Sequence, residues 1–189
     1  MTAARYMLAL ALLAAVSLAC LCLGTVMLSP AEVLSTLLGG GEELARSIVL
    51  GLRLPRLLMA LAVGASLSAS GVVFQAVLKN PLADPYITGV SGGAAFGAAL
   101  AALLSASFLP VTLAAFCGSL GAVFAVYLMS RLRGLGSTSM ILAGVALSFM
   151  LSSGVLLLFS VLRSDEVHRV LLWLMGDLSV ARYGTVARM

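Results

Sequence analysis

RLPRLLMALAVGASLSASGVVFQAVLKNPLADP, residues 53–85, places two charged, proline-containing segments at the ends of one apolar run. Residues 57–78 of this run contain no ionisable side chain. About 20 apolar residues are enough to cross the hydrocarbon core of a bilayer as a helix. Pro55 suits the first turn of such a helix, because its missing amide hydrogen is not needed there. The sequence therefore predicts a membrane-spanning helix that begins at about Leu57.

The other end of this helix is set by two prolines. Pro81 and Pro85 disfavour the α-helical region for the residues before them, Asn80 and Asp84. The helix should therefore end at Leu78 and be followed by a turn at the membrane surface.

The composition indicates a membrane protein. Hydrophobic residues make up 62% of the chain and charged residues 10%, against roughly 45–50% and 25% in soluble domains. Only helices and closed barrels satisfy every backbone hydrogen bond in lipid. The apolar runs are continuous instead of alternating with period two, which favours helices. We therefore expect an all-α polytopic membrane protein.

Apolar runs of spanning length predict about five transmembrane helices. A cleaved signal peptide is the alternative for the first run, but the run continues to Leu28, which favours a retained helix. After Leu162 a polar segment and a short apolar one predict an interfacial loop or short helix, where Trp173 suits the headgroup level. The five spans are Tyr6–Leu28, Leu57–Leu78, Ser91–Leu109, Val111–Ser130 and Met140–Leu162.

Small residues recur at every third or fourth position in four of these spans. Such spacing puts them on one helix face and permits close backbone approach between helices in lipid. The four sets are Gly64, Ser68 and Gly71; Gly93, Gly97 and Ala101; Ala114, Gly118 and Ala122; and Gly144, Ser148 and Ser152. They predict mainly helix packing.

The block that begins at Arg53 continues as YITGVSGGAAFG at residues 86–97, and ILAGVALS at 141–148 and WLMG at 173–176 follow in order. Together these segments resemble the transmembrane permease subunits of binding-protein-dependent ABC importers for iron–siderophore complexes, haem and cobalamin. The resemblance runs from about Arg53 to Ser179. It implies that residues 1–189 form a single membrane domain, the N-terminal portion of a ten-helix permease whose C-terminal half is absent.

The resemblance assigns Arg53 and Arg56 to the outer surface, where they would dock an extracytoplasmic substrate-binding protein. Guanidinium groups stay charged and bind carboxylates bidentately. The alternative is that both arginines anchor a helix end at the membrane surface. The resemblance also implies a cytoplasmic N terminus, although the count of Lys and Arg near the spans marginally prefers the opposite orientation.

The turn Asn80, Pro81, Asp84 and Pro85 would then lie at the cytoplasmic side. The resemblance places Leu82 of this turn at a narrowing of the translocation path, where an apolar constriction closes a pore by excluding water. The alternative role for Leu82 is packing within a tight turn.

Further residues are candidates for the translocation path or its gate. The resemblance adds the loop around Thr138 and Ser139 to the narrowing at Leu82. Gln75 is an amide within a span, and polar side chains there usually face protein or water. Ser148 and Ser152 offer hydroxyl groups on one helix face. Packing between helices is the alternative for Gln75, Ser148 and Ser152.

Several kinds of function find no support in the sequence. No nucleophile lies near a base, no span carries paired carboxylates, and no residues have metal-ligand spacing, so we expect no enzyme activity, metal or cofactor. Gly89–Gly93 lacks the Gly-Lys-Ser/Thr ending of a phosphate loop, so ATP hydrolysis should occur on a separate chain. The net charge of +4 is not gathered in a basic run, which gives no sign of nucleic-acid binding.

The expected function is that of a permease component in the bacterial inner membrane. It would pair with a second permease copy, cytoplasmic ATPase subunits and a substrate-binding protein, and would move iron–siderophore, haem or cobalamin by alternating access within membrane lipid. Two alternatives stay open: an inactive truncated permease, and a small membrane scaffold that binds importer components through Arg53 and Arg56.

Overall fold

The computed structural model describes residues 2–81, 83–84, 86, 89–104, 108–132, 137–178 and 181–186, and these residues contain helices but no strands. Contacts between Cα atoms divide the chain into two compact units. Unit 1 comprises Met1–Ser66 and Leu178–Met189, and unit 2 comprises Leu67–Asp177. Each unit is described by itself below. The single membrane domain over residues 1–189 stays a prediction.

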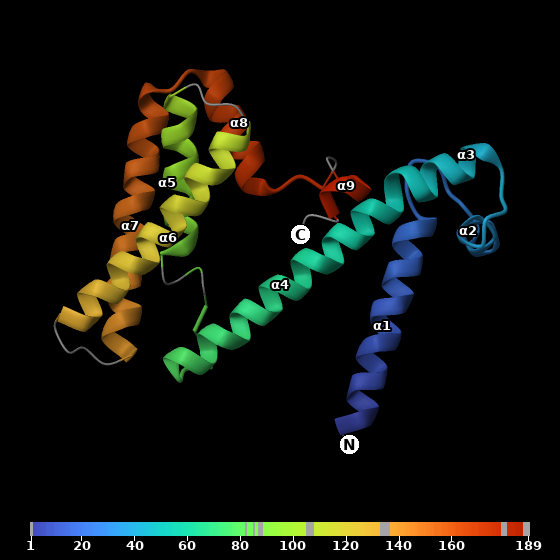
Figure 1. The fold of residues 1–189 in the computed structure, drawn as a ribbon, viewed down its shortest axis with the longest axis horizontal. Helices are drawn as coiled ribbons and strands as arrows, with labels where there is room; N and C mark the ends of the chain where they lie inside the picture. Colours follow the sequence, from blue (N-terminus) through green and yellow to red (C-terminus); the bar gives the residue numbers. More distant parts are fainter. Residues whose placement is uncertain are drawn as a thin grey trace. The chain divides into compact units, whose positions relative to one another are not determined.

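Unit 1 is built around the end of one long helix and the beginning of another (Figure 1). A small core of Leu21, Cys22, Val33 and Val49 joins them. In chain order the elements are α1 (Thr2–Cys22), α2 (Pro30–Leu37), α3 (Glu43–Arg46), the π-helix η1 (Ser47–Arg53), the first half of α4 (Leu54–Leu78) and α9 (Tyr183–Val186).

Helix α1 ends at Cys22, so the predicted end at Leu28 is wrong. The chain turns back on itself, and the Leu28 amide donates to the Cys22 carbonyl at 3.0 Å. A Cβ added at Gly24 would lie 2.7 Å from the Arg53 Nη2 atom, so glycine leaves the room that the guanidinium occupies. The apolar run continues past Cys22, but α1 ends there because Arg53 binds its last carbonyl oxygens.

The second spanning helix begins earlier than the sequence predicted. Helical structure runs without interruption over Glu43–Leu78, so the predicted start at Leu57 is wrong. Pro55 would collide with a carbonyl of the preceding turn in a regular α-helix. The wider π-helical turn avoids this problem, and the Leu54 amide donates to the Val49 carbonyl, five residues back.

The end of α4 at Leu78 confirms the prediction. Lys79 adopts the left-handed conformation, with a φ of 49°. The Lys79 amide donates to the Ala76 carbonyl at 3.3 Å and the Asn80 amide to the Gln75 carbonyl at 3.2 Å. This pair of bonds is a Schellman motif, which satisfies carbonyl groups at the helix end.

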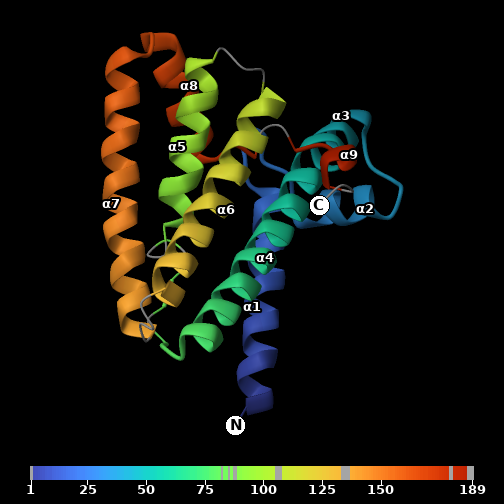
Figure 2. The same ribbon diagram turned by 60° about the vertical axis from the view of Figure 1, so that its left-hand side comes forward.

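Unit 2 is a bundle in which α5 (Val90–Leu103) lies against both α6 (Phe108–Leu132) and α7 (Ser137–Val161), as Figures 1 and 2 show. The short helix α8 (Ser164–Met175) covers α5. A core of Ala98, Ala115 and Val170 joins α5, α6 and α8, and Trp173 packs against it. The short helix expected after Leu162 is thus present.

Small residues bring α5 and α6 into backbone contact, as their spacing predicted. A Cβ added at Gly93 would lie 2.4 Å from the Gly118 carbonyl oxygen, and one added at Gly97 would lie 2.2 Å from the Ala114 carbonyl oxygen. These distances are shorter than any van der Waals contact. Glycine is therefore required at both positions for the observed approach.

Four helices in the described residues are long and apolar enough to cross a membrane: Ala3–Cys22, Glu43–Leu78, Val111–Arg131 and Ser139–Val161. The predicted span Ser91–Leu109 corresponds to α5, which has 14 residues and is about 21 Å long. That length is less than the roughly 30 Å of a bilayer core. The chain is an all-α membrane protein, as predicted.

Candidate functional site

The two arginines that the sequence singled out line one cavity in unit 1, with a volume of about 480 Å³. Arg53 is half-buried and Arg56 is exposed. Most of the other walls are apolar side chains from the end of α1 and from η1 and α4, such as Leu23, Ile48 and Leu57. Positive charge is thus concentrated at a hollow between two helix ends.

Arg53 is bound within the protein. Its Nη1 atom donates to the carbonyl oxygens of Leu21 at 2.6 Å and Cys22 at 3.0 Å, and its Nη2 atom donates to the Val26 carbonyl. The last carbonyl groups of a helix lack partners within the helix, and a cation there also interacts favourably with the helix dipole. Arg53 therefore caps the C-terminus of α1.

Arg56 is placed differently. Within the described residues it makes no hydrogen bond or ion pair, and its side chain is exposed. A planar guanidinium with free donors can bind a carboxylate of another molecule bidentately. The geometry therefore distinguishes Arg53, which is bound within unit 1, from Arg56, which is exposed.

Helix α2 supports this region. The Ser29 hydroxyl accepts from the Glu32 amide at 3.3 Å, and the Glu32 carboxylate accepts from the Ser29 amide at 2.7 Å, which forms a capping box at the start of α2. The Ser29 hydroxyl, followed by the Ser29 amide, lowers the pKa of Glu32. Val33 and Thr36 are buried on the inner face of α2. Helix α2 thus packs with a defined face against η1.

Sequence reasoning missed one contact in this region. The Tyr183 hydroxyl donates to the Leu50 carbonyl oxygen at 2.7 Å, although 133 residues separate the two in the chain. Leu50 lies in η1, the same element as Arg53, and Tyr183 is the first residue of α9. Pro55 was the only available signal, because a proline leaves a carbonyl one turn earlier without its helical partner.

The turn after α4 is held by side chains that the sequence singled out. The Gln75 Nε2 atom donates to the Pro81 carbonyl at 3.0 Å, and the Asp84 Oδ1 atom accepts from the Tyr86 amide at 2.8 Å. The Ala83 amide donates to the Asn80 carbonyl at 3.1 Å. Leu82 and Pro85 lie outside the described residues.

The candidate residues on α7 differ in their contacts and in their exposure. The Ser148 hydroxyl donates to the Gly144 carbonyl at 2.9 Å, and a Cβ added at Gly92 would lie 3.5 Å from the Ser148 Cα. Ser148 therefore faces α5. Ser152 is exposed and Ser139 half-buried. The segment around Ser139 lies in the first turn of α7 instead of a loop, and the Thr138 side chain lies outside the described residues.

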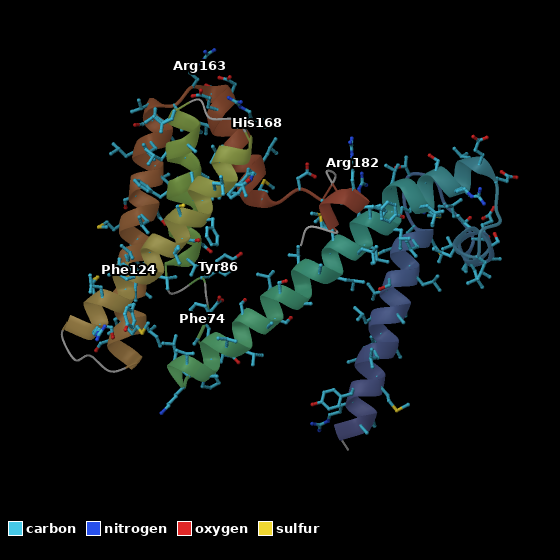
Figure 3. The ribbon with its side chains drawn as sticks, in the orientation of Figure 1. Phe74, Tyr86, Phe124, Arg163, His168 and Arg182 are labelled. Carbon is cyan, nitrogen blue, oxygen red and sulfur yellow. The ribbon has the colours of Figure 1, made fainter. Side chains whose placement is uncertain are left out.

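No group of three His, Cys, Asp or Glu side chains that could hold a metal ion occurs in the residues that the structure describes. Arg163 and His168 lie at the corner between α7 and α8 (Figure 3). Arg163 pairs with Asp165 at 3.5 Å, and both side chains are exposed. Such a surface pair contributes little to stability.

Comparison with known proteins gives a consistent match along the chain. The FecCD transport family matches residues 12–189. The achromobactin transport system permease protein of Dickeya dadantii is 40% identical over 183 residues, which cover 93% of this chain and 51% of that relative. The cobalamin import system permease protein of Halobacterium salinarum is 43% identical over 150 residues, covering 78% and 40%.

The fold has a counterpart among solved structures. An inward-facing metal-chelate type ABC transporter superposes with a TM-score of 0.74 at 29% sequence identity, covering 97% of this chain and 55% of that chain. The chain spans about half the length of the curated relatives it matches.

Proposed function

Because the chain belongs to the FecCD transport family, we propose that it works as a permease component of a binding-protein-dependent ABC importer. The importer would lie in the bacterial inner membrane and would carry an iron–siderophore complex, haem or cobalamin. The single observation that carries this proposal is the family match, which extends over almost all of the described helices.

The substrate class follows the relatives. Their names refer to achromobactin and cobalamin, and the matching structure is a metal-chelate type transporter. The proposed cargo is therefore a metal chelate, with iron–siderophore first and haem or cobalamin next.

The proposed assembly contains a second permease copy, cytoplasmic ATPase subunits and an extracytoplasmic substrate-binding protein. ATP hydrolysis on the separate ATPase chains would shift the helices between outward-open and inward-open states, which is alternating access. A permease needs no catalytic residue for this, since its part is to present a path that opens on alternate sides.

Arg56 is the proposed point of contact with the substrate-binding protein. Its exposed guanidinium is available for a carboxylate of that partner. Arg53 contributes charge to the same cavity while it caps α1. Charge complementarity mainly fixes the register of docking and speeds the encounter, which suits a partner that must bind and leave in each cycle.

The cytoplasmic end of the path is proposed at the turn after α4. Leu82 would narrow the path, with Thr138 and Ser139 as the second part of the narrowing, and Asn80, Pro81, Asp84 and Pro85 would shape the turn. The bond from Gln75 to the Pro81 carbonyl supports a role for Gln75 in holding this turn. Ser148 and Ser152 would line the path farther along α7.

Charge reversal at Arg56 tests the docking proposal. We expect Arg56→Glu to reduce the substrate-binding protein recovered with the tagged chain from native membranes by at least about tenfold, since a carboxylate would then face like charge. The thermal midpoint of the purified chain should not change, because Arg56 makes no internal bond in the described residues.

The matched control is Arg169→Glu, the same reversal at an exposed residue of α8 outside the cavity. It should leave the recovery of the binding protein unchanged. Equal recovery with Arg56→Glu and with the unaltered chain would contradict docking at Arg56.

A further inference from the structure

The π-helical turn before α4 lacks one of its own hydrogen bonds. The Leu54 amide donates to the Val49 carbonyl, five residues back. The next bond in this series would join the amide of residue 55 to the Leu50 carbonyl. Residue 55 is proline and has no amide hydrogen. Neither Leu54 nor Pro55 therefore donates to the Leu50 carbonyl.

The missing donor comes from the far end of the chain. The Tyr183 hydroxyl reaches the Leu50 carbonyl at 2.7 Å, a normal length for such a bond. Both residues belong to unit 1. Pro55 is fully buried and Leu50 is half-buried, whereas Tyr183 is exposed. The Tyr183 hydroxyl thus gives the Leu50 carbonyl a partner within the protein.

The turn also decides where the two arginines point. Each residue of an α-helix advances by about 100° around the axis, so conversion of the π-helical turn to a regular α-helical turn would rotate the residues before it relative to those after it. Val49 lies near the beginning of η1 and is buried in the core of unit 1, whereas Arg53 is the last residue of η1 and Arg56 follows it. The two arginines therefore face their cavity only while the π-helical register is kept.

We propose that Tyr183 is a positioning residue for the docking surface: its hydroxyl replaces the hydrogen bond that Pro55 removes and so fixes the register that directs Arg53 and Arg56. The functional half of this inference rests on the proposed docking at Arg56. Tyr183 thus links α9 to the docking surface.

A double-mutant cycle with Tyr183→Phe and Pro55→Ala tests the bond in the full chain in lipid nanodiscs, with hydrogen exchange of the amides in residues 51–57 as the readout. With Pro55 present, Tyr183→Phe should speed this exchange about fivefold, the effect of one lost hydrogen bond. With Pro55→Ala, the backbone itself supplies a donor to Leu50, so Tyr183→Phe should have no further effect.

The control is Tyr6→Phe, the same change at an exposed tyrosine of α1 in the same unit, which should leave exchange unchanged. Equal effects of Tyr183→Phe in the two backgrounds, or no effect with Pro55 present, would contradict the claim that this hydrogen bond supports the turn. Faster exchange throughout the chain would also overturn it, because that would indicate general destabilisation.

The positioning role has its own readout. Tyr183→Phe should lower the recovery of the substrate-binding protein from native membranes about threefold, and the double variant with Pro55→Ala should restore part of it. Unchanged recovery with Tyr183→Phe, when Arg56→Glu does reduce recovery, would overturn the positioning role. If Arg56→Glu has no effect, the docking proposal fails instead, and the exchange cycle still decides whether Tyr183 supports the turn.

Discussion

Replacement of Gly97 by alanine is expected to lower the free energy of unfolding of unit 2 by about 3 kcal/mol, the upper end of what overpacking usually costs. The added Cβ would lie 2.2 Å from the Ala114 carbonyl oxygen and 2.8 Å from the Ala114 carbonyl carbon. Both atoms belong to the backbone of α6, so neither can move aside as a side chain would. Helices α5 and α6 would have to separate.

Trp173 provides the measurement for this prediction. It is the one tryptophan of the chain, and it packs against the core of Ala98, Ala115 and Val170. Its emission in detergent micelles should shift to the red in Gly97→Ala, and the denaturant midpoint followed at the same wavelength should fall.

The control for this experiment is Gly121→Ala, since a Cβ added at Gly121 meets no atom within 4 Å. Gly121 also lies in α6, and alanine there should be neutral or slightly stabilising because of its higher helix propensity. A similar loss of stability in both variants would mean that the effect arises within the helix and not from contact between α5 and α6.

Removal of the Arg53 guanidinium is expected to open the junction between α1 and α4. Arg53→Ala deletes the donors to the carbonyls of Leu21, Cys22 and Val26. Hydrogen bonds to a charged group contribute about 1.5–3 kcal/mol, so the open state should become about 100-fold more populated.

Cys22 reports this opening directly, because it is buried beside the bonded carbonyls while Cys20 and Cys117 are exposed. In a background with Cys20→Ser and Cys117→Ser, Arg53→Ala should raise the alkylation rate of Cys22 about 100-fold. Arg53→Lys should restore only part of the protection, since an ammonium group cannot reproduce the planar fork of the guanidinium.

Arg56→Ala in the same background is the control and should leave the alkylation rate of Cys22 unchanged. Arg56 lines the same cavity but donates to none of these carbonyls. Slow alkylation in Arg53→Ala would contradict the assignment of Arg53 as the cap of α1.

The parts of the fold that sequence reasoning predicted depend on local chemistry. The end of α4 at Leu78 follows from the prolines after it, and the approach of α5 to α6 follows from the spacing of Gly93, Gly97 and Gly118. Both signals lie within a few residues of their structural effect. Local patterns of this kind can be read without knowledge of the rest of the chain.

The errors arise where distant residues decide the outcome. An apolar run can continue through Leu28, but the helix stops at Cys22 because Arg53 binds its last carbonyls. Pro55 does not mark the start of the helix, since a π-helical turn carries the helix past it. Sequence spacing could not reveal either long-range contact.

The candidate site was predictable only in part. The pair Arg53 and Arg56 was identified from its segment, and the structure places both on one cavity. The sequence could not show that Arg53 caps α1 whereas Arg56 stays exposed, because this difference depends on where α1 ends. Tyr183 escaped notice because a single tyrosine far from a proline carries no spacing signal.

The most direct test of the central claim is mass spectrometry of the complex recovered through this chain from native membranes, which identifies its companions and their stoichiometry. The account predicts two permease copies together with ATPase subunits and a substrate-binding protein. Recovery of the chain with no ATPase, under conditions that retain other membrane complexes, would contradict the account and favour an inactive truncated permease or a small membrane scaffold.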